Sequence, residues 1–249
     1  MNNWIIEFLD CKDLSENSYK SYFYDLRQFN HLVEQKITEE KLKIYQAHLN
    51  QLSLSAQLRK LSAVNQFLEF LYFKKHISHF YKLELLSKKN SNHKKDYQLI
   101  DLEVLYDKNQ DGLSGQYIAL LIFELGLLPT EILHLKQTDF NSDFQILRVE
   151  KKAFFRILNV SECLLPFLED LQDGQKNYLF DFKGRPYSRQ WAFNQLNRYL
   201  EQVGYADMTA QSLREQYILR QIDLGVSLFE LMKQLGLKSP TTLEKYFRT

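Results

Sequence analysis

Arg214 and Tyr246 carry side chains that could act together on a phosphate group, and they stand 32 residues apart near the end of the sequence. An arginine guanidinium can hold a phosphate through two parallel N–H bonds, and a tyrosine hydroxyl can serve as a nucleophile. Each residue also has an ordinary alternative, because most arginines lie on surfaces or in ion pairs and most C-terminal tyrosines pack in a core. The pair therefore raises a hypothesis of phosphoryl chemistry.

A hairpin with lysines in its turn is a further candidate feature. Residues 144–149 and 155–160 have the pattern of two short strands, and Lys151 and Lys152 lie in the turn between them. Turn lysines commonly serve solubility, so contact with a nucleic acid and plain solvation both stay open. His134 follows Leu133 on an apolar helix face, which favours a structural role over a catalytic one.

The elements that must position these residues are predicted mostly as helices. Eight glycines and four prolines in 249 residues favour helices over a turn-rich β-sandwich. In the first part of the chain, Ser15, Thr38 and Ser55 are the predicted N-caps of three helices, each followed by apolar residues at helical spacing. In the second part, a largely apolar helix is predicted over 117–125, another begins at Pro129, and helices resume near 163 and after 188.

The third predicted helix has a polar side whose environment the sequence leaves open. It carries Gln57, Arg59, Lys60 and Asn65 opposite an apolar stripe. A solvated face and a surface that faces a nucleic acid are both compatible with this pattern.

Residues 87–95 contain four lysines and no acidic or apolar residue, which indicates an exposed linker between two domains. Its lysines could lie on phosphates, although plain solvation is the simpler interpretation. The net charge of +1 hides an asymmetry, because residues 1–95 hold 15 basic and 10 acidic side chains and residues 96–249 hold 17 and 21. Duplex DNA would therefore favour the first part of the chain.

Several classes of protein are disfavoured by what the sequence lacks. Cys11 and Cys163 form neither a disulfide framework nor a metal-binding pattern, and we expect each to be a buried or idle thiol. There is no glycine-rich phosphate loop and no internal repeat. No apolar run approaches the roughly 18–20 residues that span a bilayer, so the expected partners include no membrane and the expected location is cytoplasmic.

The C-terminal stretch resembles the C-terminal box of the tyrosine recombinases, enzymes that cut DNA through a phosphotyrosine. Across the whole chain, short segments that resemble the Xer-type members occur in the same order as in those proteins, and the resemblance is greatest to the XerD-like subgroup. The N-terminal matches are LSENS at 14–18, DLRQF at 25–29, LSA at 61–63 and FLEFL at 67–71. The C-terminal matches are LGL at 125–127, EILHL at 131–135, YLF at 178–180, GRPYSRQ at 184–190, SLR at 212–214, YILRQI at 217–222, LGLKSPTT at 235–242 and LEKY at 243–246.

This resemblance implies a mainly α fold in two domains. A four-helix-type core-binding domain (SAM-like, DNA-binding) is expected over residues 1–86, followed by a basic linker over 87–96. A mostly helical catalytic-type domain with a small β-hairpin or sheet is expected over 97–249. The implied partners are duplex DNA and other recombinase subunits.

The resemblance also implies a mechanism that uses neither a metal nor a small-molecule cofactor. Tyr246 takes the place of the nucleophile that joins the DNA 3′-phosphate, and Arg214 takes the place of the second of two arginines that brace the phosphate. The lysine that protonates the departing 5′-oxygen falls on Lys151 or Lys152. This hairpin is one residue shorter than the usual pattern, and we favour Lys151. The expected DNA contacts are Arg59, Lys60, Lys152 and Arg189.

Four positions depart from the family pattern. The first arginine is replaced by Leu128, and two histidines are replaced by Gln211 and Leu237; in the third helix a frequent DNA-contacting arginine is Asn65. Loss of one transition-state donor typically costs about 10²–10³ in rate. The sequence therefore predicts a degenerate active site whose cleavage activity is weak or absent.

Three functions remain open on the sequence alone. The chain could be a slow recombinase, a DNA-binding or regulatory relative that does not cut, or a partner protein that does not bind DNA. The sequence ends three residues after Tyr246, so we expect a C-terminal tail that docks on a neighbouring subunit to be absent or minimal. That expectation slightly favours the third function.

Overall fold

The computed structural model describes residues 1–85, 99–108, 113–151 and 154–247. The chain divides into two compact units, Met1–His93 and Lys94–Thr249, and each is described by itself. The predicted linker over 87–96 lies outside the described residues, and so does Lys152.

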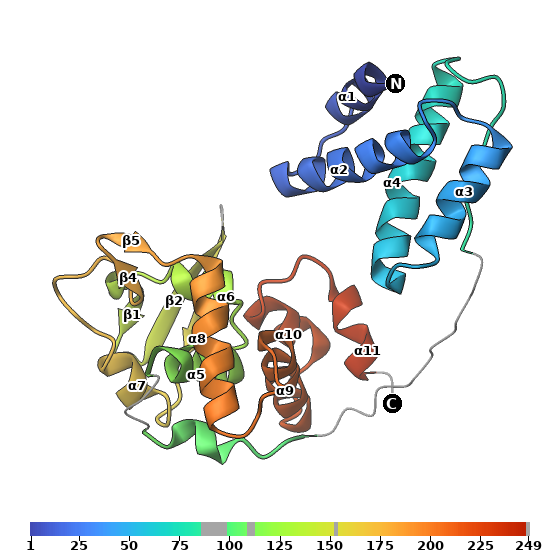
Figure 1. The fold of residues 1–249 in the computed structure, drawn as a ribbon. Coiled ribbons are helices and arrows are strands. Elements are labelled where there is room, and N and C mark those ends of the chain that lie inside the picture. The colour runs from blue at the N-terminus through green and yellow to red at the C-terminus, as the bar shows by residue number, and fades with distance from the viewer. Residues whose placement is uncertain (86–98, 109–112, 152–153, 248–249) are drawn as a thin grey trace. The chain divides into compact units, whose positions relative to one another are not determined.

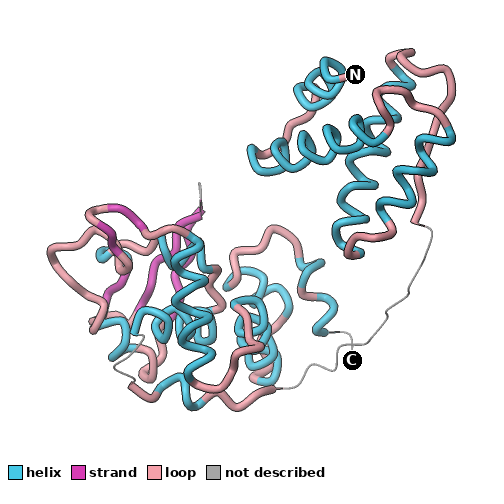
Figure 2. Tube along the Cα trace, viewed as in Figure 1, coloured by secondary structure: helices cyan, strands magenta, loops and turns pink. Residues whose placement is uncertain are grey.

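The first unit is helical throughout its regular structure (Figures 1 and 2). Its core is a set of apolar side chains with almost no exposed surface, among them Leu26, Phe29, Tyr45 and Phe67. The rings of Phe29 and Tyr45 meet edge to face, with centroids 4.9 Å apart. The helices are α1 (Asn2–Asp10), α2 (Glu16–Leu32), α3 (Glu39–Leu49) and α4 (Leu54–Phe73).

Two of the three predicted N-caps in this unit are confirmed. The Ser15 hydroxyl accepts the backbone N–H of Ser18, and the Thr38 hydroxyl accepts that of Lys41. The prediction of Ser55 is wrong, because α4 begins at Leu54 and its N-cap is Ser53, which has extended backbone angles. The Ser53 hydroxyl makes no side-chain cap bond.

The second unit is built around one buried helix, α5 (Leu113–Leu125). Residues 117–122 of this helix expose almost none of their surface. Helix α8 (Arg189–Gln202) and helix α9 (Ala210–Asp223) pack against α5, and the short α6 (Pro129–Leu133) follows it. The other helical segments are η1 (Glu103–Tyr106), η2 (Gln137–Asp139), α7 (Leu165–Glu169), α10 (Leu228–Gln234), η3 (Pro240–Thr242) and α11 (Glu244–Phe247).

Among the described residues the strands lie in the second unit (Figure 2). An antiparallel sheet has the order β1 (Phe140–Asn141), β2 (Ile146–Lys151), β3 (Phe154–Asn159), and a small ribbon joins β4 (Asp181–Phe182) to β5 (Arg185–Pro186). The mainly α fold with a small sheet is thereby confirmed.

The predicted bounds of the hairpin are wrong by one or two residues at each end. Residues 142–145 form a turn, in which the Asn141 side chain accepts the N–H of Phe144 and Gln145 has a φ of 50°. Strand β2 therefore begins at Ile146 and continues through Lys151, which pairs with Phe154. Lys151 is thus a strand residue, at the edge of the turn in which we expected it.

Two further expectations concern residues outside the core. Of the two alternatives expected for the cysteines, the buried thiol is wrong, since Cys11 and Cys163 are both exposed and form no disulfide; the idle thiol stays a prediction. No helix among the described residues is long and apolar enough to span a membrane.

Candidate active site

Tyr246 lies on α11, where the end of the chain folds back against α9 and α10. Leu243 and Tyr246 are buried in a small apolar cluster with Tyr217, Leu231 and Leu235. The hydroxyl of Tyr246 reaches a polar group at the edge of this cluster and donates a hydrogen bond to Glu215 Oε1 at 3.0 Å. The packing of its ring and the hydrogen bond of its hydroxyl therefore both hold the Tyr246 side chain in place.

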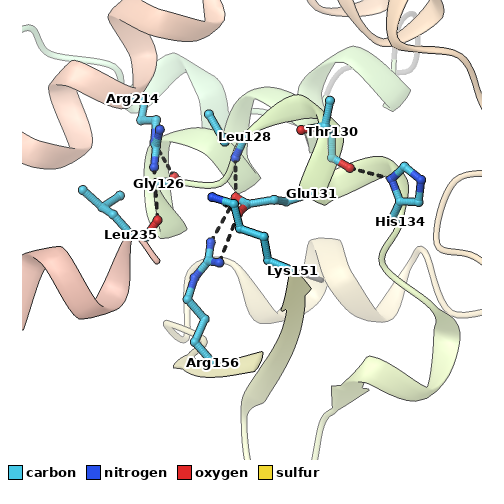
Figure 3. A network of polar contacts seen from close by, with 9 residues as sticks. All are labelled: Gly126, Leu128, Thr130, Glu131, His134, Lys151, Arg156, Arg214 and Leu235. Atoms are coloured by element: carbon cyan, nitrogen blue, oxygen red, sulfur yellow. Dashed lines mark hydrogen bonds and ion pairs between the residues drawn. The ribbon is translucent and has the colours of Figure 1, made fainter. Parts of the chain in front are cut away.

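Arg214 lies in the first half of α9, and backbone carbonyls hold its guanidinium (Figure 3). Its Nε donates to the Gly126 carbonyl at 2.7 Å, and Nη2 lies 3.4 Å from the Leu235 carbonyl. Gly126 has a φ of 62°, and a Cβ there would lie 2.5 Å from the Tyr217 ring. Only glycine therefore fits the turn that presents this carbonyl to Arg214.

Arg214 and Tyr246 line one cavity of about 400 Å³. The structure thus brings together the two residues that the sequence singled out, and the cavity is large enough for a phosphate group. Gln211 and Leu237, which stand where the resemblance expects histidines, line the same cavity. The remaining lining residues are Ile218, Leu235, Thr241, Thr242, Leu243 and Lys245.

The surroundings of Tyr246 keep its hydroxyl protonated. Burial raises the pKa of Tyr246 above its ordinary value of about 10, and the charge of Glu215 raises it further. Lys245 opposes this shift, with its ammonium 4.5 Å from the centre of the tyrosine ring and 3.8 Å from Glu215. At neutral pH the phenol is therefore neutral, and a proton acceptor would have to take its proton during any attack.

Lys151 lies at the end of β2 and faces a carboxylate on α6. Its Nζ is 3.6 Å from Glu131 Oε1. The same carboxylate receives two hydrogen bonds from the Arg156 guanidinium, at 3.1 and 3.0 Å, and one from the Leu128 backbone N–H at 2.9 Å. Figure 3 shows Lys151 and Arg156 both directed at Glu131. Lys151 and Arg156, both from the β2–β3 hairpin, thus pair with the buried carboxylate of Glu131.

Burial opposes the ionisation of Glu131, but the hydrogen bonds from Arg156 and the Leu128 N–H outweigh it and lower the Glu131 pKa. A carboxylate whose pKa is lower in the folded state stabilises the fold above its unfolded pKa of about 4.3, and this contribution is lost as the pH falls through the folded pKa.

We expect Glu131→Gln to lower the free energy of unfolding by about 2 kcal/mol at neutral pH, because charge-assisted hydrogen bonds are lost. The difference between wild type and variant should shrink as the pH falls below about 4.3 and through the lowered pKa of folded Glu131. Urea unfolding of both proteins at several pH values measures this difference. A penalty that stays constant down to low pH would show that ionisation of Glu131 contributes nothing.

A second cavity, of about 330 Å³, is lined by Leu128, Glu131, His134 and Lys151 with neighbouring residues. Leu128 is therefore placed beside a cluster of charged side chains, where the resemblance expects an arginine. His134 is the C-cap of α6, and its Nδ1 lies 2.7 Å from the Thr130 carbonyl in the first turn of that helix (Figure 3). This contact gives His134 a structural role at the end of α6.

The sequence reasoning missed Arg156, Glu131 and Glu215. Arg156 left one signal: it alternates along β3 with the exposed residues Phe155 and Ile157, so its side chain points to the opposite face of the strand. Glu215 directly follows Arg214, and its contact with Tyr246 depends on where α11 packs.

The residues predicted to contact DNA differ in how exposed their side chains are. Arg189 is exposed at the start of α8, with its guanidinium 5.2 Å from the Phe193 ring centre. In the first unit, Arg59 is half-exposed and pairs with Asp25. Lys60 is buried, and its ammonium binds Asp25 at 2.8 Å and Gln28 at 2.6 Å.

The polar side of α4 is therefore only partly a solvated face. Besides the buried Lys60, Asn65 is used internally, because its amide exchanges two hydrogen bonds of 2.8 Å with the backbone of Leu83. Asn65 thus fixes the segment after α4, at the position where the resemblance expects an arginine.

Curated relatives show the family. The tyrosine recombinase XerD-like protein of Streptococcus mutans is 48% identical over 248 residues and covers 100% of both chains. The proteins of the same name from Streptococcus uberis and Streptococcus gordonii are 49% and 50% identical, over 97% and 99% of this chain and 97% and 100% of their own lengths. No family model matches. This chain belongs to the tyrosine recombinases, and within them to the XerD-like group.

Solved structures agree in fold. The Tn1549 transposon integrase, in complex with a circular intermediate DNA, has a TM-score of 0.74 at 11% identity and covers 98% of this chain and 94% of that chain. The XerH recombinase bound to its difH substrate has a TM-score of 0.67 at 14% identity, over 98% and 92%. At these identities the likeness shows the fold alone.

Proposed function

We propose that this chain is a DNA-binding tyrosine recombinase with a degenerate active site, in which cleavage is weak. The observation that carries the proposal is that Arg214 and Tyr246 line one cavity of a size for a phosphate. The DNA complexes of the integrase and of XerH support duplex DNA as the partner. In this proposal residues 1–86 are the core-binding domain and residues 97–249 the catalytic-type domain, and further recombinase subunits complete the assembly.

The proposed reaction is a phosphoryl transfer. The Tyr246 oxygen attacks a backbone phosphorus, the bond from phosphorus to the 5′-oxygen breaks, and a 3′-phosphotyrosyl link forms. Lys151 gives a proton to the departing 5′-oxygen, and Glu215 lies where it can accept the phenol proton. Arg214 stabilises the charge on the phosphate oxygens, which is the main source of rate in such sites.

The weakness of the site has a physical cause. Leu128 and Leu237 cannot donate a hydrogen bond, and Gln211 can donate one but cannot transfer a proton. In addition, the carboxylate of Glu215 lies beside the nucleophile and repels an incoming phosphate. These features support a second candidate function, a relative that binds DNA and does not cut it.

An adduct assay on nicked duplexes separates the two functions. We expect wild type to form a covalent protein–DNA adduct slowly, and Tyr246→Phe to form none while it binds the duplex with unchanged affinity. A denaturing gel with labelled DNA measures the adduct, and fluorescence anisotropy measures the binding.

The control variant is Tyr205→Phe, which removes a hydroxyl that donates to the Asp101 carbonyl from a tyrosine that lines neither cavity. Binding without any adduct in wild type would establish the non-cutting candidate. No binding at low salt would refute both candidates and favour a partner protein that does not act on DNA.

A further inference from the structure

Arg156 lies against Gly236, which neighbours the cavity that Arg214 and Tyr246 line. A Cβ at Gly236 would be 2.8 Å from Arg156 Nη1 and 3.3 Å from its Cζ. Gly236 stands between Leu235 and Leu237, which both line that cavity. The missing side chain at position 236 is therefore what lets the guanidinium approach the cavity wall.

Two cations, Arg156 and Lys151, share the single Glu131 carboxylate. A third cation, Arg214, lies near them: burial lowers the pKa of Arg214, the charge of Glu131 opposes this shift, and the charge of Arg156 adds to it. Lys151 and Arg156 thus face one carboxylate, while the guanidinium of Arg214 bonds to two backbone carbonyls (Figure 3). A second anion would reduce the remaining repulsion, and a DNA phosphate is such an anion.

Arg156 also has an unused donor. Its Nε is buried and has no hydrogen-bond acceptor among the described residues. Buried donors are nearly always paired, so this nitrogen marks a place where an acceptor is missing.

We propose that Arg156 is a phosphate-binding residue of this site, reaching the phosphate from β3 alongside Arg214. The inference rests on the proposed DNA-binding function. Glu131 holds the guanidinium in the free chain, and the phosphate displaces one carboxylate oxygen when DNA binds. Arg156 then supplies the guanidinium that Leu128 lacks, because the Glu131 carboxylate bonds to both residues.

The salt dependence of DNA binding tests this inference, because a purely structural role would not change it. Each phosphate contact contributes about 0.9 to the slope of log K against log salt concentration. The proteins to compare are wild type, Glu131→Gln, and Glu131→Gln combined with Arg156→Met, on a duplex pool of random sequence. The double variant leaves no carboxylate unpaired, which avoids the cost of a buried charge without a partner.

We expect Glu131→Gln to bind more tightly than wild type, and the double variant to lose about 0.9 of slope relative to Glu131→Gln. Equal slopes for these two variants would overturn the inference. Arg156→Gln, which removes the charge and keeps amide donors for Glu131, gives the same comparison against wild type should the double variant unfold.

Arg214→Ala distinguishes this failure from failure of the proposed function. If wild type and Arg214→Ala differ in slope and the Arg156 variants do not, only the inference about Arg156 is wrong. If wild type shows no salt-dependent binding at all, the proposed function fails and the inference fails with it.

Discussion

Replacement of Asp25 by alanine should destabilise the first unit by about 3–5 kcal/mol. The carboxylate is almost fully buried, with 3% of its side chain exposed, and it pairs with both Arg59 and Lys60. Without it, the Lys60 ammonium stays buried against the neutral amide of Gln28 alone. An ammonium that loses its counter-ion in the interior is among the costliest single changes in a small unit.

Denaturant unfolding monitored by Trp4 fluorescence measures this effect. Trp4 lies in the first unit and stacks on His76, with ring centres 4.3 Å apart, so its emission reports on that unit. The measurement uses a Trp191→Phe background, which removes the signal from the second unit. The double variant Asp25→Leu with Lys60→Met should recover most of the loss, because neither charge is then left unpaired.

Arg59→Ala is the matched control in the same cluster. Its side chain is 46% exposed, and exposed ion pairs contribute about 0–1 kcal/mol. A loss as large as that of Asp25→Ala would contradict the assignment of Lys60 as the internal partner. In a DNA-binding assay we expect the reverse order: Arg59→Ala should weaken the affinity more than Asp25→Ala does, because Arg59 is the accessible cation of α4.

The sequence predicted the helices of the first unit because their signals are local. Ser15 and Thr38 each precede apolar residues at helical spacing, and both make the expected cap bonds. The start of α4 could not be predicted in this way, since Ser53 and Ser55 are chemically the same.

The residues of the candidate site also separate into those that the sequence could predict and those that it could not. Spacing and residue type brought out Arg214 and Tyr246, and the shared cavity agrees with that prediction. The Glu131–Arg156 pair has no such signature, because its partners are 25 residues apart and meet only when the hairpin packs on α6. Lys60 shows the opposite case, since a charged residue that the pattern predicted on a polar face is paired inside the unit.

Restoring both histidines at the cavity, with Gln211→His and Leu237→His, should raise the rate of adduct formation by about 10²-fold or more. One transition-state donor is worth about 10²–10³ in rate, and two that act together do not simply add. Both positions already line the cavity with Tyr246. At position 211 the present amide lies 3.3 Å from Glu215, so a histidine there has a carboxylate to orient its ring.

The adduct assay on nicked duplexes measures this gain, and Tyr246→Phe in the restored background should form no adduct. Leu128→Arg provides the informative contrast. Because Arg156 already supplies a guanidinium beside Glu131, Leu128→Arg should add little to the restored protein and should rescue it after Arg156→Gln. A large gain from Leu128→Arg with Arg156 intact would mean that the site lacks an arginine. No gain from the two histidines, in a variant that folds and binds DNA, would instead place the defect at Glu215, whose charge faces the nucleophile.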